Sequence, residues 1–320
     1  MLQLTTGNGI LARPSMGSWL LYGLGTENQN LPGFLTISPT FYHGGAQAYS
    51  SAFLPAIYQG MRVGDGNTPA KEMKFDSLAV ADPEQRLQLD LIQARNRQAL
   101  GRANDDSRLE ARIESYELAF RMQMSIPEVM DLSKESKATM ALYGVGEEPT
   151  DDFGRQCLLA RRFSEKGVRF VQVSHSYPRS YWDQHSNLYK GHTANALKVD
   201  KPIAGLLNDL KQRGMLKDTL VIWGTEFGRS PAVQGSDGRD HNNNGYTMWM
   251  AGGGVKGGMT YGATDDLGWF AVEDKVHIRD FHATVLRLMG LDHTKLIYRY
   301  AGRDWRLTDV GGEVQQKILT

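Results

Sequence analysis

Side chains that ligate metals and bind anions gather in three short stretches of the C-terminal half of the chain. They are Asp183 and His185 in WDQH, Glu226 and Arg229 in GTEFGR, and Arg239, Asp240 and His241 in GRDH. Carboxylates and imidazoles without thiols suit zinc, manganese or another divalent ion held by nitrogen and oxygen ligands. A planar guanidinium matches the oxygens of a sulfate or phosphate group bidentately. Taken together, the stretches predict one shared metal centre.

Each stretch also has a simpler structural interpretation. The alternatives are loop hydrogen bonding for Asp183 and His185, a mutual salt bridge for Glu226 and Arg229, and a turn for Asp240 and His241. His192 is a further candidate ligand, but it stands where a long helix is expected to begin and can cap or pack there. Arg229 and Arg239 can orient neighbouring acids instead of binding a substrate anion.

The elements around these stretches predict an α/β fold. Residues 151–167 and 192–215 carry apolar residues at helical spacing, and the runs 168–175 and 218–226 are predicted strands. Helices and strands that alternate with short connections are typical of a sheet with substantial parallel pairing. Functional residues in such sheets lie beyond the carboxyl ends of the strands. WDQH and GTEFGR follow the two predicted strands, so their side chains are expected to meet there.

Other segments complete the predicted architecture of one α/β domain spanning residues 1–320. Residues 31–39 predict a short buried strand bounded by prolines, and 247–262 predict a strand followed by a glycine-rich turn. Residues 82–143 carry apolar side chains at helical spacing, among them Leu87 and Leu91, and predict a helical insertion of two or three helices.

Composition excludes several classes of partner and site. The chain has 320 residues with 36 basic and 36 acidic side chains, so bulk charge gives no reason to expect nucleic acid or a membrane surface as a partner. No run approaches the ~20 apolar residues of a membrane span, and the first residues lack the basic and apolar regions of a signal peptide. The single cysteine, Cys157, rules out an internal disulfide and a thiolate-rich zinc site, and it is expected in the core.

Five stretches in combination resemble the DUF1501 family, a bacterial family of sulfatase-like proteins. They are WDQH at 182–185, DLKQRGMLKDTLVIWGTEFGRSP at 209–231, GRDHNNNGYTMWMAGGGVKGG at 238–258, DFHATVLRLMGLDH at 280–293 and YRYAGRDWRLTDVGGEV at 298–314. The resemblance covers essentially the whole chain. It implies the fold of the alkaline phosphatase superfamily, in which a central, largely parallel sheet is flanked by helices and metals are held by Asp and His at strand ends.

The resemblance also implies roles for individual residues. The implied metal ligands are Asp183, His185, Glu226, Asp240 and His241, and the implied oxyanion contacts are Arg229 and Arg239. Where superfamily members carry an Asp-His pair, this chain has Glu226 and Phe227, so one acid has a different length and one imidazole is absent. The ion is expected to be zinc, manganese or calcium.

The resemblance raises an expectation about the start of the chain as well. Family members carry a twin-arginine export signal, and the nucleophile of the superfamily comes from an early segment. This chain begins at MLQLTTGNG, where relatives complete their first helix, so both features are expected to be missing from it. A periplasmic or secreted location is expected from the family.

Two functions follow as hypotheses. The first is a metal-dependent hydrolase of sulfate or phosphate esters, acting on a small-molecule or glycan ester. The alternative is a non-catalytic, sulfatase-like scaffold that binds an anionic glycan or a protein partner, and the substituted pair at Glu226 and Phe227 favours it. A hydrolase of this kind requires a tightly bound metal ion, whereas a scaffold does not.

Overall fold

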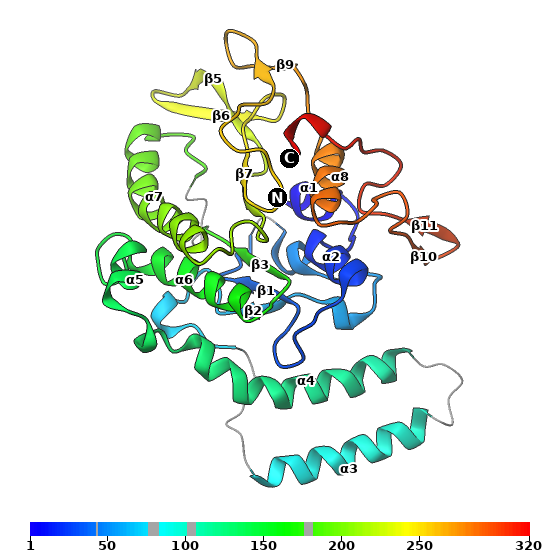
Figure 1. Ribbon diagram of the computed structural model, residues 1–320. Coiled ribbons are helices and arrows are strands. Elements are labelled where there is room, and N and C mark those ends of the chain that lie inside the picture. Colours follow the sequence, from blue (N-terminus) through cyan, green and yellow to red (C-terminus); the bar gives the residue numbers. More distant parts are fainter. Residues whose placement is uncertain (43, 76–82, 101–106, 176–181) are drawn as a thin grey trace.

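A small parallel sheet forms the centre of a mixed α/β fold (Figure 1). The computed structural model describes residues 1–42, 44–75, 83–100, 107–175 and 182–320. The sheet has the strand order β2–β1–β3, with β1 at Phe34–Ile37, β2 at Met61–Val63 and β3 at Phe170–Val173. Leu35 of β1 pairs with Met61 on one side and Val171 on the other. The strands predicted at 31–39 and 168–175 are therefore confirmed, each with fewer residues.

Helices cover both faces of this sheet because successive strand side chains point to opposite faces. Val171 and Val173 pack into a core cluster with residues of α6 (Asp151–Glu165) and α7 (Leu188–Gln212). Phe170 packs into a second cluster with residues of α2 (Met16–Leu24) and α8 (Ile278–Leu288). All four residues of β1 are buried, and three of them are apolar, as expected for a strand covered on both faces. Cys157 lies buried in the α6 cluster, and burial raises the pKa of its thiol.

Local signals set the ends of several helices. Ser15 caps α2 by accepting a hydrogen bond from the backbone N–H of Ser18. His277 and Asp280 form a reciprocal capping box at the start of α8. The short helices are α1 (Leu2–Thr6), α5 (Lys137–Leu142) and 3₁₀ turns at Gly45–Tyr49, Ala56–Tyr58, Ala70–Glu72, Leu132–Lys134 and Gln316–Ile318.

The other strands form antiparallel pairs instead of extending the parallel sheet. They are β4 (Val221–Trp223) with β7 (Trp249–Ala251), β5 (Gly228–Gln234) with β6 (Gly238–Asn242), β8 (Ala263–Thr264) with β9 (Ala271–Glu273), and β10 (Tyr298–Tyr300) with β11 (Arg303–Trp305). This corrects the expectation of a largely parallel sheet, since parallel pairing in the described chain is confined to β1, β2 and β3. Ile222 of β4 and Phe170 of β3 pack on the same core cluster, so burial gives both strands apolar sequences without pairing them.

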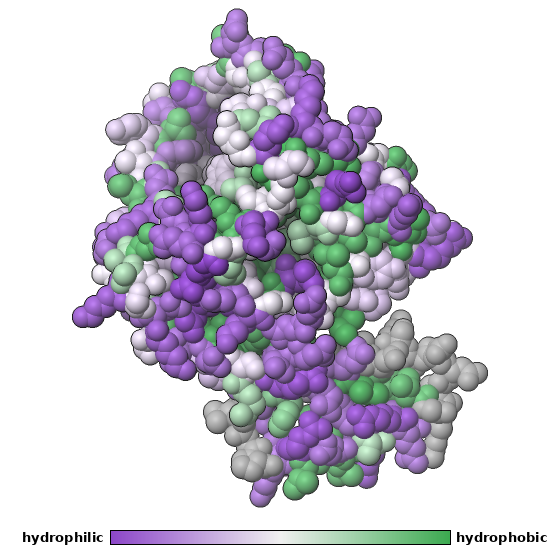
Figure 2. All heavy atoms as spheres, viewed as in Figure 1, coloured by the Kyte–Doolittle hydropathy of each residue, from purple (hydrophilic) through white to green (hydrophobic). Residues whose placement is uncertain are grey.

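The helical region predicted at 82–143 contains a long helical pair that extends away from the sheet (Figure 1). Its helices are α3 (Pro83–Leu100) and α4 (Ser107–Met130), followed by α5; residues 82 and 101–106 lie outside the described chain. The C-terminal part of α4 reaches the core through Met122, Ile126 and Val129. Figure 2 shows apolar side chains on the outer edge of the pair. Helices long and apolar enough to cross a bilayer are absent from the described residues.

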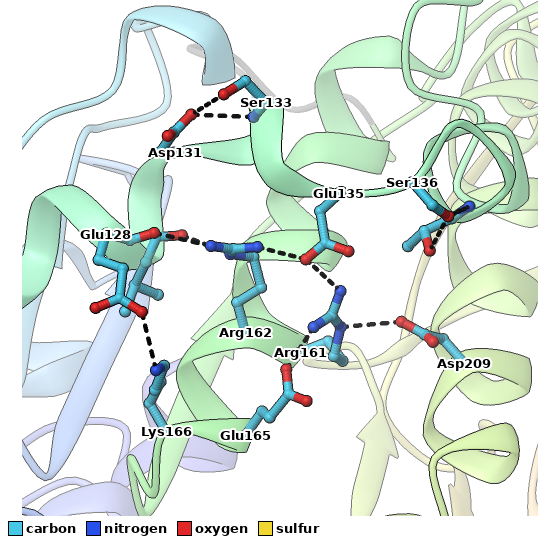
Figure 3. A network of polar contacts seen from close by, with 12 residues as sticks. Glu128, Asp131, Ser133, Glu135, Ser136, Arg161, Arg162, Glu165, Lys166 and Asp209 are labelled. Atoms are coloured by element: carbon cyan, nitrogen blue, oxygen red, sulfur yellow. Dashed lines mark hydrogen bonds and ion pairs between the residues drawn. The ribbon is translucent and has the colours of Figure 1, made fainter.

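A network of charges ties α6 to α7 and to the segment before α5 (Figure 3). The side chain of Arg161 is only 1% exposed and lies 2.7 Å from Glu135, 2.5 Å from Glu165 and 2.9 Å from Asp209. Arg162 contacts the same carboxylate of Glu135. Burial favours the protonated form of Glu135, but hydrogen bonds from both arginines outweigh it and hold the pKa of that carboxyl below its ordinary value. Arg161 is thus a buried cation in contact with three acidic side chains.

We expect Arg161→Met to lower the free energy of unfolding by about 3 kcal/mol, because breaking a buried ion pair from one side leaves carboxylates uncompensated. Lys166→Met is the control, since Lys166 pairs with Glu128 at a half-exposed site. Its effect on the urea midpoint should be much smaller. Equal shifts of the two midpoints would contradict this account of the network.

His282 couples the stability of the fold to pH. Burial in α8 lowers the pKa of this imidazole to about 4, and its hydrogen bond to the Leu4 carbonyl oxygen (2.7 Å) offsets that only in part. An unfolded histidine binds its proton near pH 6.5, so the unfolded state takes up a proton first as the pH falls. The native state therefore loses stability between about pH 6.5 and 4, by roughly 3 kcal/mol in total.

The variant His282→Gln retains an N–H donor and removes this titration. Its unfolding free energy, measured by urea denaturation at several pH values, should fall less steeply than that of the wild type across the same window. Parallel curves for the two proteins would show that His282 carries no such linkage.

Candidate metal centre

The hairpin of β5 and β6 forms one side of the candidate site. Arg229 and His241 pair directly across it, so their side chains emerge on the same face. The register shifts between Arg229 and Val233, which marks a bulge, and Gly235 adopts a φ of 62° in the turn. GRDH accordingly lies on a strand, and the alternative interpretation of Asp240 and His241 as a turn is corrected.

The segment that carries Asp183 and His185 is fastened to this hairpin at Gly238. The backbone N–H of Arg239 donates to the carbonyl oxygen of Gln184 at 3.1 Å. A Cβ atom at position 238 would lie 1.9 Å from the carbonyl oxygen of His185, so only glycine admits the contact. This close approach sets the distance between the segment and β6.

Three donor atoms converge where the segment meets the hairpin. Oδ1 of Asp183 lies 2.8 Å from Nε2 of His241 and 3.0 Å from Nε2 of His185, and the two Nε2 atoms are 3.1 Å apart. Within the described chain, these residues form the group of carboxylate and imidazole side chains compact enough to hold one ion. Both imidazoles are exposed, so this point is open to solvent.

Neighbouring side chains fix the orientation of both imidazoles. Nδ1 of His185 lies 2.5 Å from Oε1 of Gln234, which can only accept a hydrogen bond. Nδ1 is therefore a donor, and in the neutral ring Nε2 keeps the lone pair that a metal ligand requires. The ring of Phe227 stacks on His241 with centroids 4.1 Å apart. Sequence reasoning missed Gln234, because its contact depends on the hairpin register and no motif marks it.

Arg229 holds the carboxylate of Asp183 in place. Its Nη2 donates to Oδ1 of Asp183 at 2.6 Å and to the carbonyl oxygen of Trp182 at 2.9 Å, and its Nη1 donates to the carbonyl oxygen of Arg239 at 3.2 Å. Partial burial favours protonated Asp183, but hydrogen bonds from Arg229 and His241 outweigh it and lower the pKa to about 2. The carboxylate is therefore ionised at neutral pH, as a metal ligand must be.

Three residues expected at the site lie outside this ligand group. Asp240 neighbours His241 on β6 and so points to the opposite face, where it accepts a hydrogen bond from the backbone N–H of His241 at 2.7 Å. Glu226 lies in the connection between β4 and β5. His192 lies in the first turns of α7 and packs edge-on against Trp182, with centroids 5.5 Å apart.

A pocket of ≈ 460 Å³ lies next to Arg229. Its lining residues are Leu188, Tyr189, His192, Thr193, Arg229, Ser230 and Arg239. Nη1 of Arg239 donates to the carbonyl oxygen of Gly238 at 2.8 Å. Arg229 and Arg239 are the two arginines of this largely apolar lining, and a guanidinium suits an anionic group that carries several oxygens.

The donor set fits a zinc or manganese ion. One carboxylate oxygen and two imidazole nitrogens form the ligand type of catalytic zinc sites, which leave a further position for water or substrate. Donor atoms 2.8–3.1 Å apart can be bridged by one ion with bonds of about 2.0–2.2 Å. Calcium prefers six to eight oxygen ligands and fits this set less well.

We expect the protein to bind one zinc or manganese ion per chain, and Asp183→Ala or His241→Ala to abolish binding because each removes one of three ligands. Elemental analysis after dialysis measures this. Asp240→Ala is the matched control, since it alters the adjacent residue on the opposite face of β6 and should retain the ion. Glu226→Gln should retain it as well. An ion kept by His241→Ala, or lost from Asp240→Ala, would place the site elsewhere.

The sequence was compared with family models, with curated proteins and with solved structures. Neither the curated proteins nor the solved structures gave a match. The family described as "Protein of unknown function (DUF1501)" matches residues 1–319. Because that match spans nearly the entire sequence, the chain belongs to the DUF1501 family.

Proposed function

We propose that this protein is a metal-dependent hydrolase of sulfate or phosphate esters, with its active site at Asp183, His185 and His241. The observation that carries the proposal is the convergence of three ligand atoms within 3.1 Å of one another beside an arginine-lined pocket. A divalent ion held there supplies a Lewis acid that polarises the ester and lowers the pKa of water. The resemblance to the alkaline phosphatase superfamily supports the same chemistry.

The side chains around the ligand group have different roles in this proposal. Arg229 donates to Asp183 and to two backbone carbonyls, so it positions a ligand. Arg239 borders the pocket and binds the sulfate or phosphate oxygens. The Ser230 hydroxyl also lines the pocket, but it donates to the Ala232 carbonyl at 2.9 Å, so its proton is not directed at a base. We therefore assign the attack on the ester to water.

Phe227 favours a second candidate, a non-catalytic scaffold that binds an anionic glycan or a protein partner. Its ring covers one face of His241, and Glu226 stands apart from the ligand group. Two-metal hydrolases need a second ion about 3.5–4 Å from the first, and an aromatic ring on His241 offers no ligand for one. An arginine-lined pocket without that ion binds sulfate groups and need not turn them over.

Hydrolysis of 4-nitrophenyl sulfate and 4-nitrophenyl phosphate by the zinc- or manganese-loaded protein separates the two candidates. Loss of a residue that only supports a metal ligand lowers metal affinity or activity about 10–100-fold. His241→Ala removes a ligand itself, so it should reduce turnover at least 100-fold. Asp240→Ala should leave it within a few-fold of the wild type. If the metal-loaded protein hydrolyses neither ester, yet binds dextran sulfate in a manner that Arg239→Ala abolishes, the scaffold is correct and the hydrolase is not.

A further inference from the structure

Helix α3 turns polar side chains toward its neighbour and leaves two leucines exposed among the charged residues of its solvent side. The side that contacts α4 carries Arg86 and Gln93 beside the buried Leu89, and Gln93 is 1% exposed. Leu87 and Leu91 lie on the opposite side and are 72% and 61% exposed. A surface helix usually buries its apolar stripe against the protein, so the exposure of both leucines departs from the normal arrangement.

The polar side of α3 is only partly satisfied by α4. Nε2 of Gln93 donates to the carbonyl oxygen of Ile113 at 2.7 Å, and Arg86 pairs with Glu117 at 3.1 Å. In the described chain, however, Oε1 of Gln93 and Nδ2 of Asn96 are buried without a hydrogen-bond partner. The α3–α4 contact therefore leaves polar atoms unsatisfied, and Leu87 and Leu91 take no part in it.

The exposed stripe consists of Glu84, Leu87, Leu91 and Arg95, spaced three or four residues apart along one helical face. Ile92 extends it on one edge and is 45% exposed. Its ends carry opposite charges, an acid before the two leucines and a base after them. When two such stripes lie antiparallel, the acidic end of each therefore meets the basic end of the other.

We propose that α3 packs against α3 of a second copy of this chain, antiparallel and about a two-fold axis between residues 89 and 90. Glu84 of each copy then faces Arg95 of the other, and Leu87 faces Ile92. Leu91 lies beside Gln88 between these two ion pairs. The parallel alternative would bring like charges together. Closed two-fold contacts are the commonest among soluble homo-oligomers, and antiparallel helices place opposite dipole ends side by side.

Charge reversal tests this arrangement directly. Sedimentation equilibrium of the full chain over roughly 1–100 µM, where small interfaces dissociate, should show a concentration-dependent dimer. Glu84→Arg and Arg95→Glu should each weaken self-association at least tenfold, because each places two pairs of like charges in contact. An equimolar mixture of the two variants should dimerise like the wild type, since every contact then joins an arginine to a glutamate.

Arg97→Glu is the matched control, because it makes the same charge change on α3 away from the stripe. It should dimerise as the wild type does. A wild-type chain that stays monomeric throughout, an equal effect of Arg97→Glu, or a mixture that fails to associate would each overturn the proposal. A monomer that binds anionic vesicles, and loses this binding in Leu91→Glu, would instead assign the stripe to a lipid surface.

Discussion

The ion pair between Asp183 and Arg229 joins the two parts of the chain on which the candidate metal centre depends. One partner comes from the segment that follows β3, and the other comes from the hairpin of β5 and β6. Because Arg229 also donates to the carbonyl oxygens of Trp182 and Arg239, its guanidinium is held by both parts at once. The contact at Gly238 sets how closely they approach. The position of Oδ1 of Asp183 relative to both imidazoles follows from these two constraints.

Motif reasoning named all three residues of this group, but it did not separate them from the neighbours that lie apart. Asp183, His185 and His241 converge, whereas Asp240 points away although it neighbours His241 in the same motif. The difference arises because adjacent residues on a strand face opposite sides, and a motif does not state that its residues form a strand. Gln234 illustrates the same limit, since its contact with His185 is created by the register and bulge of the hairpin. The α/β class, in contrast, follows from local apolar patterns, and these are readable without knowing the register.

Apolar periodicity predicts an element but not the partner on which that element packs. The runs at β3 and β4 both pack against the cluster formed with α2 and α8, yet β3 pairs with β1 and β4 pairs with β7. The hydrophobic effect has no direction, so two strands on one core carry similar sequences whatever their hydrogen-bond partners are. In α3 the same pattern identified a helix correctly, and it left open whether the apolar stripe faces its own chain. The polar contacts of Arg86 and Gln93 decide that it does not.

Phe227 has a consequence for how a hydrolase at this site would work. The ring stacked on His241 offers no ligand atom to a second ion on that side of the ligand group. The remaining positive charge beside an ester must then come from Arg239, which borders the pocket. A guanidinium can donate two hydrogen bonds to one oxyanion, but it is not a Lewis acid. Activation of both the ester and the water would therefore rest on one ion, and the low pKa of Asp183, about 2, keeps one of its three ligands charged across the physiological range.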